Sequence, residues 1–254
     1  MELNGRVVVV TGGTRGVGAG IAKSFLAAGA RVVVCARRPP EAPVAAEGRE
    51  ASFAAVDLRD PAAVQGFFEG VAARYGRLDC LVNNAGGTPY RLLGEGGAER
   101  HARVVELNLL APMTASLAAY PWLRGAGGSV VMIGSVSGTR PSPGTAAYGA
   151  AKAALENLAR SMAVEWAPEV RVNSLVLGMV RTELSHLHYG DEAGVAAVGA
   201  TVPLGRLAEP SDIGAAAVFL ASDRAAYVSG ASLLVHGGGE RPAFLDAATV
   251  NKES

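Results

Sequence analysis

Short runs of Val, Ile and Leu alternate with longer alanine-rich segments along the whole chain, and this alternation restricts the fold most. The runs are continuously apolar, as is typical of strands buried on both faces. Successive parallel strands need a crossover helix, which the alanine-rich segments can provide. We therefore expect an α/β fold with a doubly wound parallel sheet of about seven strands and helices on both faces. The expected strands are 6–10, 31–35, 52–56, 78–82, 129–133, 170–176 and 232–236, and the expected helices are 17–28, 61–75, 98–120, 148–166 and 211–221.

No linker or compositional break divides the sequence, so residues 1–254 are expected to form a single domain. Lys plus Arg equals Asp plus Glu at 23 each, without a long run of one sign, which argues against a nucleic-acid partner.

No leader is evident and no stretch of about 18 apolar residues occurs. We expect a cytoplasmic protein without a membrane partner. Cys35, Cys80 and the histidines lack metal-ligand spacing, and we interpret His186 and His188 as polar loop residues. We expect no metal.

A glycine-rich turn, T-G-G-T-R-G-V-G at 11–18, follows the first expected strand. Gly12, Gly16 and Gly18 would let the backbone turn sharply and approach a pyrophosphate. The helix that starts near Val17 would point free N–H groups and its positive dipole end at that phosphate. The turn could be merely structural, but its place between a four-valine strand and a helix favours nucleotide binding.

The end of the second expected strand bears on the choice between NAD and NADP. A carboxylate there would accept hydrogen bonds from a ribose 2′-hydroxyl, whereas a cation suits a 2′-phosphate. Ala36 stands where an acidic residue could be, Arg37 follows it, and Arg15 could reach the same place. Both arginines could be ordinary solvated residues. Because guanidinium groups suit phosphate oxygens, we expect NADP(H) and leave NAD(H) open.

Two more turns are expected at the same edge of the sheet. Asp57 follows the third expected strand and could accept a hydrogen bond from an adenine amino group or cap the next helix. Asp60, directly before Pro61, fits the capping role better. The sequence N-N-A-G at 83–86 closes the fourth strand and is expected to lie over the cofactor, although Asn and Gly also favour a plain turn.

Tyr148 and Lys152 lie four residues apart in an alanine-rich segment, so a helix would place them on one face. A phenol has a pKa of about 10. A nearby cation would lower that pKa, as a proton donor or acceptor near neutral pH requires. Ser135, thirteen residues upstream, could hold a substrate oxygen beside the phenol. Taken alone, the pair could equally be a Tyr and a Lys on a half-exposed helix.

Together these motifs resemble the classical short-chain dehydrogenase/reductase family. Thr11-Gly12-x-x-x-Gly16-x-Gly18 is similar to its cofactor turn, residues 83–86 to its N-N-A-G segment, residues 170–182 to the strand and turn beside the nicotinamide, and Asn108, Ser135, Tyr148 and Lys152 to its catalytic tetrad. The resemblance covers about residues 3–239. The stretch I-G-S-V-S-G at 133–138 and the Arg15 turn resemble the 3-oxoacyl thioester reductase branch. Leu177-Gly178 replaces the usual Pro-Gly, and His236 replaces an Asp.

The resemblance implies a Rossmann fold and an NADP(H)-dependent oxidoreductase that interconverts a secondary alcohol and a ketone. It implies that Tyr148 transfers the proton, that Ser135 binds the substrate oxygen, that Lys152 binds the nicotinamide ribose and lowers the Tyr148 pKa, and that Asn108 interrupts its helix and holds a water linked to Lys152. The implied cofactor-binding residues are Gly12, Thr14, Arg15, Gly16, Val17, Gly18, Arg37, Asp57, Leu58, Asn84, Ala85, Gly86, Tyr148, Lys152, Gly178, Val180 and Thr182.

The small-molecule substrate, a carbonyl compound or an alcohol, is left open. The resemblance favours a 3-oxoacyl thioester of CoA or acyl carrier protein. A steroid or other cyclic alcohol, oxidised with NAD(H), is the alternative, because the variable lid at 184–207 is rich in small residues. A non-catalytic nucleotide-sensing protein would not need the whole tetrad. The resemblance also implies a homotetramer or homodimer through the helices at 98–120 and 148–166, with a second contact from the final strand and the C-terminal tail. That the tail 240–254 reaches a neighbouring subunit's lid is a separate hypothesis.

Overall fold

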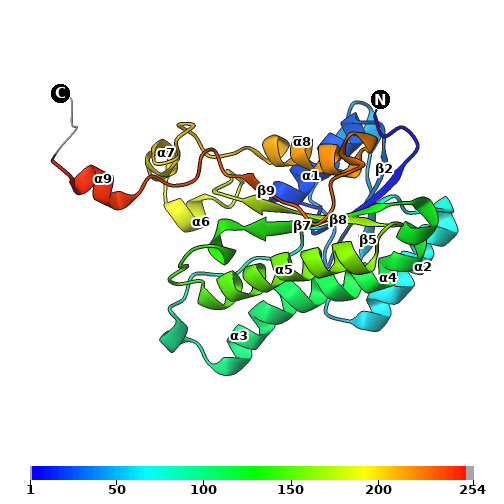
Figure 1. Cartoon of the computed structure of the whole chain (residues 1–254), viewed down its shortest axis with the longest axis horizontal. Helices are drawn as coiled ribbons and strands as arrows, with labels where there is room; N and C mark the ends of the chain where they lie inside the picture. The colour runs from blue at the N-terminus through cyan, green and yellow to red at the C-terminus, as the bar shows by residue number, and fades with distance from the viewer. Residues whose placement is uncertain (1, 250–254) are drawn as a thin grey trace.

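A seven-stranded parallel sheet forms the centre of the protein in the computed structural model, which describes residues 2–249 (Figure 1). In spatial order its strands are β5 (Ser52–Ala55), β2 (Arg31–Ala36), β1 (Val7–Thr11), β6 (Cys80–Asn83), β7 (Ser129–Ser135), β8 (Arg171–Leu177) and β9 (Ser232–Val235). Each lies within two residues of its expected bounds. The strand order changes direction between β1 and β6, and a crevice at such a switch point is where open α/β sheets bind ligands.

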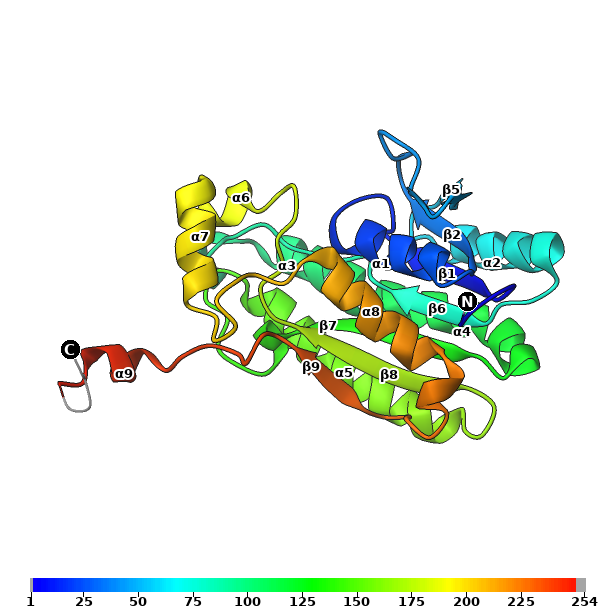
Figure 2. The ribbon, with the colours of Figure 1, turned by 90° about the horizontal axis from the view of Figure 1, so that it is seen from above.

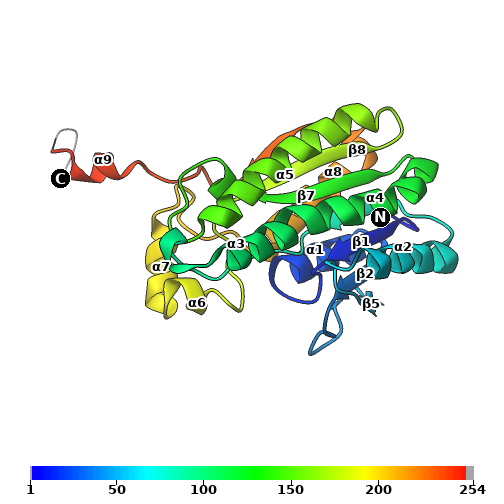
Figure 3. The same cartoon turned by 90° about the horizontal axis from the view of Figure 1, so that it is seen from below.

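Helices cover both faces of the sheet, as expected. On one face lie α1 (Gly16–Ala27) and α8 (Pro210–Ala221), seen from above in Figure 2, and on the other lie α2 (Pro61–Tyr75), α4 (Ala111–Ala126) and α5 (Ala146–Glu165), seen from below in Figure 3. Strand β1 explains why the apolar runs are continuous. Val7 and Val9 belong to the core beneath α2, α4 and α5, whereas Val8 and Val10 belong to the core beneath α1 and α8.

Helices α1 and α8 approach each other closely because glycines face the partner helix at the crossing. A methyl group added to Gly20 would overlap Pro210, and one added to Gly214 would overlap Ser24. By contrast, Gly66 in α2 is exposed and has nothing within 4 Å of an added Cβ.

These two environments predict opposite effects for the same substitution. Gly20→Ala should lower the free energy of unfolding by about 1–3 kcal/mol, because the added methyl overpacks the α1–α8 contact. Gly66→Ala, the matched control, should raise it by roughly 0.5–1 kcal/mol through helix propensity alone. Urea unfolding of both variants measures the difference, and equal shifts in the same direction would contradict the packing argument.

The expected single helix at 98–120 is interrupted. Helix α3 (Ala98–Val105) leads into a π-helical turn at Glu106–Leu110, and α4 then continues to Ala126. Pro112 has no N–H to donate to the carbonyl group four residues before it, and Asn108 Nδ2 donates to the Val104 carbonyl oxygen at 2.9 Å. The interruption expected at Asn108 is therefore present, as one wider turn rather than a break.

Several elements were not expected from the sequence. The lid contains α6 (His186–Tyr189) and α7 (Glu192–Ala200), and its buried Val195, Val202 and Leu207 form a small cluster of their own. The remaining elements are a hairpin of β3 (Ala45–Ala46) and β4 (Arg49–Glu50), 3-10 turns at Leu93–Glu95, Val136–Gly138 and Asp223–Ala225, and α9 (Ala243–Ala247) in the tail. Residues 250–254 of the predicted tail lie outside the described residues. Within residues 2–249, no helix has the length and hydropathy needed to cross a bilayer.

Candidate active site

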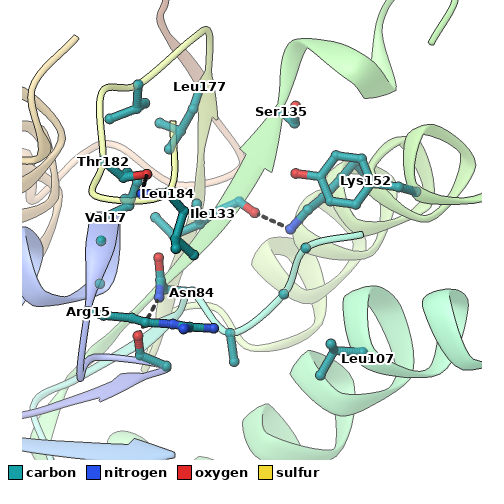
Figure 4. A pocket seen from close by; sticks show the side chains of 18 of the residues that line it. Arg15, Val17, Asn84, Leu107, Ile133, Ser135, Lys152, Leu177, Thr182 and Leu184 are labelled. Carbon is teal, nitrogen blue, oxygen red and sulfur yellow. Dashed lines mark hydrogen bonds between the residues drawn. The ribbon is translucent and has the colours of Figure 1, made fainter. Parts of the chain in front are cut away.

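A cavity of about 890 Å³ opens at the carboxyl ends of the parallel strands, at the switch point between β1 and β6. Every residue predicted to bind the cofactor lines this cavity, and so do Ser135, Tyr148 and Lys152. Figure 4 shows Arg15 and Asn84 on one side of it and Ser135 and Lys152 on the other. The fold thus brings together residues from six turns that are far apart in sequence.

The glycine-rich turn has the conformation that a phosphate-binding loop needs. Gly12 and Gly16 have φ angles of 62° and 53°, in the left-handed region that glycine adopts easily. Arg15 precedes α1 without capping it through its side chain, so the first N–H groups of the helix remain available to an anion. These features fit the pyrophosphate of a dinucleotide.

The turn after β6 is fastened to the turn after β1. Thr11 Oγ1 accepts hydrogen bonds from the Asn84 and Ala85 backbone N–H groups, each at 3.0 Å, and Asn84 Nδ2 donates to the Thr11 carbonyl oxygen at 2.9 Å. A methyl group on Gly18 would overlap the Gly12 carbonyl oxygen and the Asn84 amide. Glycine at position 18 is thus needed for packing within the turn.

Asn83 does not lie over the cavity, contrary to the expectation for the N-N-A-G segment. Its side chain is buried and donates to Ser116 Oγ at 2.8 Å, on the α4 side of the sheet. Successive side chains of a strand point to opposite faces, which separates Asn83 from its neighbour Asn84. Only Asn84, Ala85 and Gly86 of the segment line the cavity.

Asp57 lines the cavity in a bidentate ion pair with Arg59, a contact that was not predicted from the sequence. Arg59 Nη2 lies 2.6 Å from Asp57 Oδ2, and Arg59 Nε donates to Oδ1 at 3.0 Å. This hydrogen bonding lowers the pKa of Asp57 to about 2, and the positive charge of Arg37 also lowers it. A basic residue two positions after Asp57 was the only local signal for the ion pair.

Asp60 caps α2, as expected, because its Oδ1 accepts hydrogen bonds from the N–H groups of Ala62 and Ala63.

Lys152 is buried beside Tyr148. Its side chain is 3% exposed, and its Nζ lies 5.5 Å from the Tyr148 ring centroid and donates to the Ile133 carbonyl oxygen at 2.7 Å (Figure 4). Burial lowers the pKa of Lys152 to about 8. Burial also raises the pKa of Tyr148, which a hydrogen bond with Ser135 partly offsets.

The direction of the Tyr148 shift is opposite to the one expected from the sequence. The expectation considered only the cation four residues away, but loss of solvent penalises the phenolate and has the largest effect. Lys152 Nζ donates its hydrogen bond to the Ile133 carbonyl oxygen rather than to the phenol. The Tyr148 phenol is therefore held in its neutral, proton-bearing form.

Asn108 lies behind the cavity wall rather than in it. It is fully buried, its Oδ1 accepts from the Gly87 N–H at 2.9 Å, and its Nδ2 donates to the Gly87 carbonyl oxygen at 3.0 Å. These bonds hold the segment after β6 close to Lys152, because Gly86 packs against both Asn108 and Lys152. The predicted water link between Asn108 and Lys152 stays a prediction.

Other parts of the cavity wall were not predicted as site residues. Among them are Val136, Ser137 and Arg140 after β7, Met179 after β8, Leu184, His188 and Tyr189 in the lid, and Arg100 and Arg103 on α3. Among the described residues, no three His, Cys, Asp or Glu side chains are grouped so that they could hold a metal ion.

The two cysteines are buried in the core. Burial raises the pKa of Cys35 and Cys80 to about 12, so both thiols are unreactive at neutral pH.

Comparison with known proteins gives consistent matches over nearly the whole chain. A family model described as enoyl-(acyl carrier protein) reductase matches residues 12–240. L-fucose dehydrogenase of Oryctolagus cuniculus is 38% identical over 93% of this chain and 85% of its own. The 3-oxoacyl-(acyl-carrier-protein) reductase FabG of Escherichia coli is 35% identical over 94% of this chain and 98% of its own.

Solved structures agree with these sequence matches. Ligand-free aldohexose dehydrogenase AldT of Thermoplasma acidophilum superposes with a TM-score of 0.88 at 27% identity, over 99% of this chain and 98% of its own. A short-chain alcohol dehydrogenase from Sinorhizobium meliloti gives a TM-score of 0.85 at 34% identity, over 93% of this chain and 97% of its own. The chain therefore belongs to the short-chain dehydrogenase/reductase family and is an oxidoreductase that acts on CH–OH groups.

Proposed function

We propose that the protein interconverts a secondary alcohol and a ketone with NADP(H), using Tyr148 as the acid/base. The observation that carries this proposal is the arrangement of the cavity. The glycine-rich turn, Arg15 and Arg37 line one part of it, and Ser135, Tyr148 and the buried Lys152 line another. A dinucleotide extended between these parts would bring its reactive end to the phenol.

Each residue of this group has a role that its surroundings support. Ser135 donates a hydrogen bond to the substrate oxygen, and the neutral Tyr148 phenol gives its proton to that oxygen when a ketone is reduced. Lys152 binds ribose hydroxyls and stabilises the phenolate that remains, and Asn108 positions the backbone beside it. A bound nicotinamide supplies the hydride chemistry.

The preference for NADP(H) predicts a selective effect at Arg37. Arg37 lines the cavity, and the exposed Arg38 beside it does not. Arg37→Ala should weaken NADPH binding by about tenfold or more, equivalent to about 1.4 kcal/mol, and leave NADH binding unchanged. Arg38→Ala is the matched control and should change neither. Fluorescence titration with both cofactors measures the ratio, and unchanged NADPH affinity in Arg37→Ala would show that the 2′-phosphate is bound elsewhere.

A 3-oxoacyl thioester is one substrate candidate, supported by the match to FabG and by the Ser135 region of the sequence. A hydroxylated cyclic alcohol is the second. It is supported by the match to L-fucose dehydrogenase and by the polar and charged side chains of Ser137, Arg140, His188 and Tyr189 in the cavity wall. A steroid would cover those polar side chains without giving them hydrogen-bond partners. Among cyclic alcohols we therefore favour a sugar-like compound over a steroid.

The deciding experiment measures cofactor turnover in both directions. NADPH and then NADH oxidation is followed with an acetoacetyl thioester, and NADP⁺ and NAD⁺ reduction with L-fucose and cyclohexanol, each with Tyr148→Phe as control. Turnover of any of these that is lost in the variant supports the proposed chemistry and identifies the cofactor and substrate class. Absence of cofactor binding, or equal turnover in the variant, would refute it.

We also propose that the protein is a cytoplasmic homotetramer or homodimer. Leu117 on α4 and Val164 on α5 are 61% and 80% exposed, and Leu234 on the edge strand β9 is also exposed. Apolar side chains on the long helices and at an open sheet edge are features of faces covered by another copy. Sedimentation velocity should therefore give a dimer or tetramer mass, and Leu117→Glu should shift it toward the monomer.

A further inference from the structure

Three segments that are far apart in sequence meet at the cavity wall near Ser135. They are the loop after β7, which carries Arg140, helix α6, which carries Tyr189, and the segment after β9, which carries Glu240. Arg140 and Tyr189 line the cavity. Arg140 Nη2 lies 2.6 Å from Glu240 Oε1, and Arg140 Nη1 donates to the Pro141 carbonyl oxygen at 3.1 Å. The C-terminal segment is thus fastened to the substrate side of the site.

Tyr189 lies within electrostatic reach of both members of this ion pair. Burial raises the pKa of its phenol, the positive charge of Arg140 lowers it, and the negative charge of Glu240 raises it. His188 also lines the cavity, with its ring centroid 6.1 Å from that of Tyr189. A guanidinium, a phenol and an imidazole therefore line the cavity, and a carboxylate is paired with the guanidinium.

The path of the backbone explains how Glu240 reaches Arg140. Gly237, Gly238 and Gly239 have φ angles of 64°, 97° and 88°, which other residues adopt only under strain. Added methyl groups at Gly237 and Gly238 would press on Val202 and Pro203. The three glycines therefore carry the chain tightly past the lid and place Glu240 against Arg140, which lines the cavity.

The ion pair keeps hydrogen-bonding capacity for a ligand. The Arg140 and Glu240 side chains are 40% and 43% exposed, so both are accessible from solvent, and Arg140 also lines the cavity. Arg140 has five N–H donors, of which the two observed bonds use one each, and the Glu240 carboxylate has further acceptor sites. Donors and acceptors lie side by side, and the pair has no net charge.

This arrangement discriminates among ligand chemistries. Each hydroxyl group both donates and accepts, so neighbouring hydroxyls match a paired guanidinium and carboxylate. An anionic ligand would gain no net attraction from this neutral pair, and an apolar chain or ring would desolvate the two charges without replacing their hydrogen bonds. A polyhydroxylated compound is the class that satisfies both partners.

We propose that Arg140, Glu240 and Tyr189 bind the non-reacting hydroxyl groups of a polyhydroxylated substrate, a sugar or polyol, and so select it. The inference rests on the proposed alcohol–ketone chemistry and goes beyond it by assigning the selecting residues. It makes the C-terminal segment part of the substrate site.

The test compares substrates that differ in their extra hydroxyl groups. We would measure kcat/KM of the full chain for L-fucose, D-glucose and myo-inositol against cyclohexanol, in the wild type, Glu240→Gln and Arg140→Met. At least one hydroxylated compound should lose about tenfold or more in kcat/KM in both variants, mainly through KM, while cyclohexanol turnover and NADPH affinity stay unchanged. The matched control is Glu169→Gln, which breaks the Arg124–Glu169 pair away from the cavity and should change nothing.

A second readout does not depend on turnover. In Tyr148→Phe with saturating NADP⁺, the preferred sugar should raise the midpoint of thermal unfolding, because a ligand that binds only the folded state stabilises it. The added Glu240→Gln substitution should abolish that rise.

The outcomes separate this inference from the proposed function. If the wild type turns over cyclohexanol or an acetoacetyl thioester but no hydroxylated compound, or if the variants lose activity equally on cyclohexanol and the sugars, the selecting role is refuted and the proposed chemistry stands. If the wild type turns over no alcohol or ketone of the panel with either cofactor, both are refuted.

Discussion

Replacing Tyr148 with phenylalanine should lower kcat by about 10²–10⁴-fold, the usual contribution of a positioned general acid, and leave NADPH affinity unchanged. The side chain is half-buried, loss of solvent raises the pKa of the phenol and keeps the proton on it, and the ring lies 5.5 Å from Lys152 Nζ. Phenylalanine preserves that ring and removes only the proton donor. Steady-state kinetics with fluorescence titration of NADPH separates the two effects.

The control for this variant is Tyr75→Phe. Tyr75 also loses a hydroxyl group with a hydrogen-bond partner, since its Oη lies 3.0 Å from Ser52 Oγ, but it does not line the cavity. Its turnover should equal that of the wild type. Retained turnover in Tyr148→Phe would mean that another group transfers the proton, and the proposed mechanism would be wrong.

Lys152→Met should lower kcat by about 10²-fold or more and weaken NADPH binding, because it removes the buried cation beside Ser135 and Tyr148. The same substitution should change the pH dependence of stability. In the folded state burial lowers the pKa of Lys152 from 10.5 to about 8. Between these two values the unfolded chain binds more protons at this residue than the folded chain, so the contribution of Lys152 to stability rises with pH across that window. Below about pH 8 the cost of burying the charge is fully present.

Methionine has a similar length and no proton to lose, so the variant lacks this rise. The free energy of unfolding of Lys152→Met minus that of the wild type should therefore be more positive at pH 7 than at pH 9.5, measured with urea. Lys23→Met on the exposed face of α1 is the control and should show no such difference. A pH-independent difference for Lys152→Met would contradict the buried, destabilising lysine.

Local sequence patterns were sufficient to predict the sheet and the glycine-rich turn of the cavity. Four consecutive valines in β1 indicate a strand buried on both faces, and they divide between the two cores as that pattern requires. The glycine-rich turn is predictable because only glycine tolerates its backbone angles. Asn83 was assigned to the cavity because a motif was treated as a unit, although the alternation of strand side chains separates it from Asn84.

Burial and contacts between distant segments could not be predicted in this way. The pKa of Tyr148 depends on how much contact with solvent its side chain loses when α5 packs against the sheet. The spacing of Tyr148 and Lys152 in the sequence does not predict that loss. Arg140 precedes β8 and Glu240 follows β9. The two residues are far apart in sequence, so no local pattern predicts that they form an ion pair. The three glycines before Glu240 predict a turn, but they do not predict which part of the protein the following residue contacts.

The chain order of the cavity-lining residues has a consequence for how such a protein can diversify. The glycine-rich turn and the turns after β2, β5 and β6 lie in the first half of the chain, whereas Arg140, the lid residues that line the cavity and Glu240, which is paired with Arg140, all follow Ser135. Replacing or lengthening the lid and the C-terminal segment would therefore alter which alcohol is accepted without touching the first half of the sequence. A duplicated gene could acquire a new substrate by exchanging only its 3′ portion.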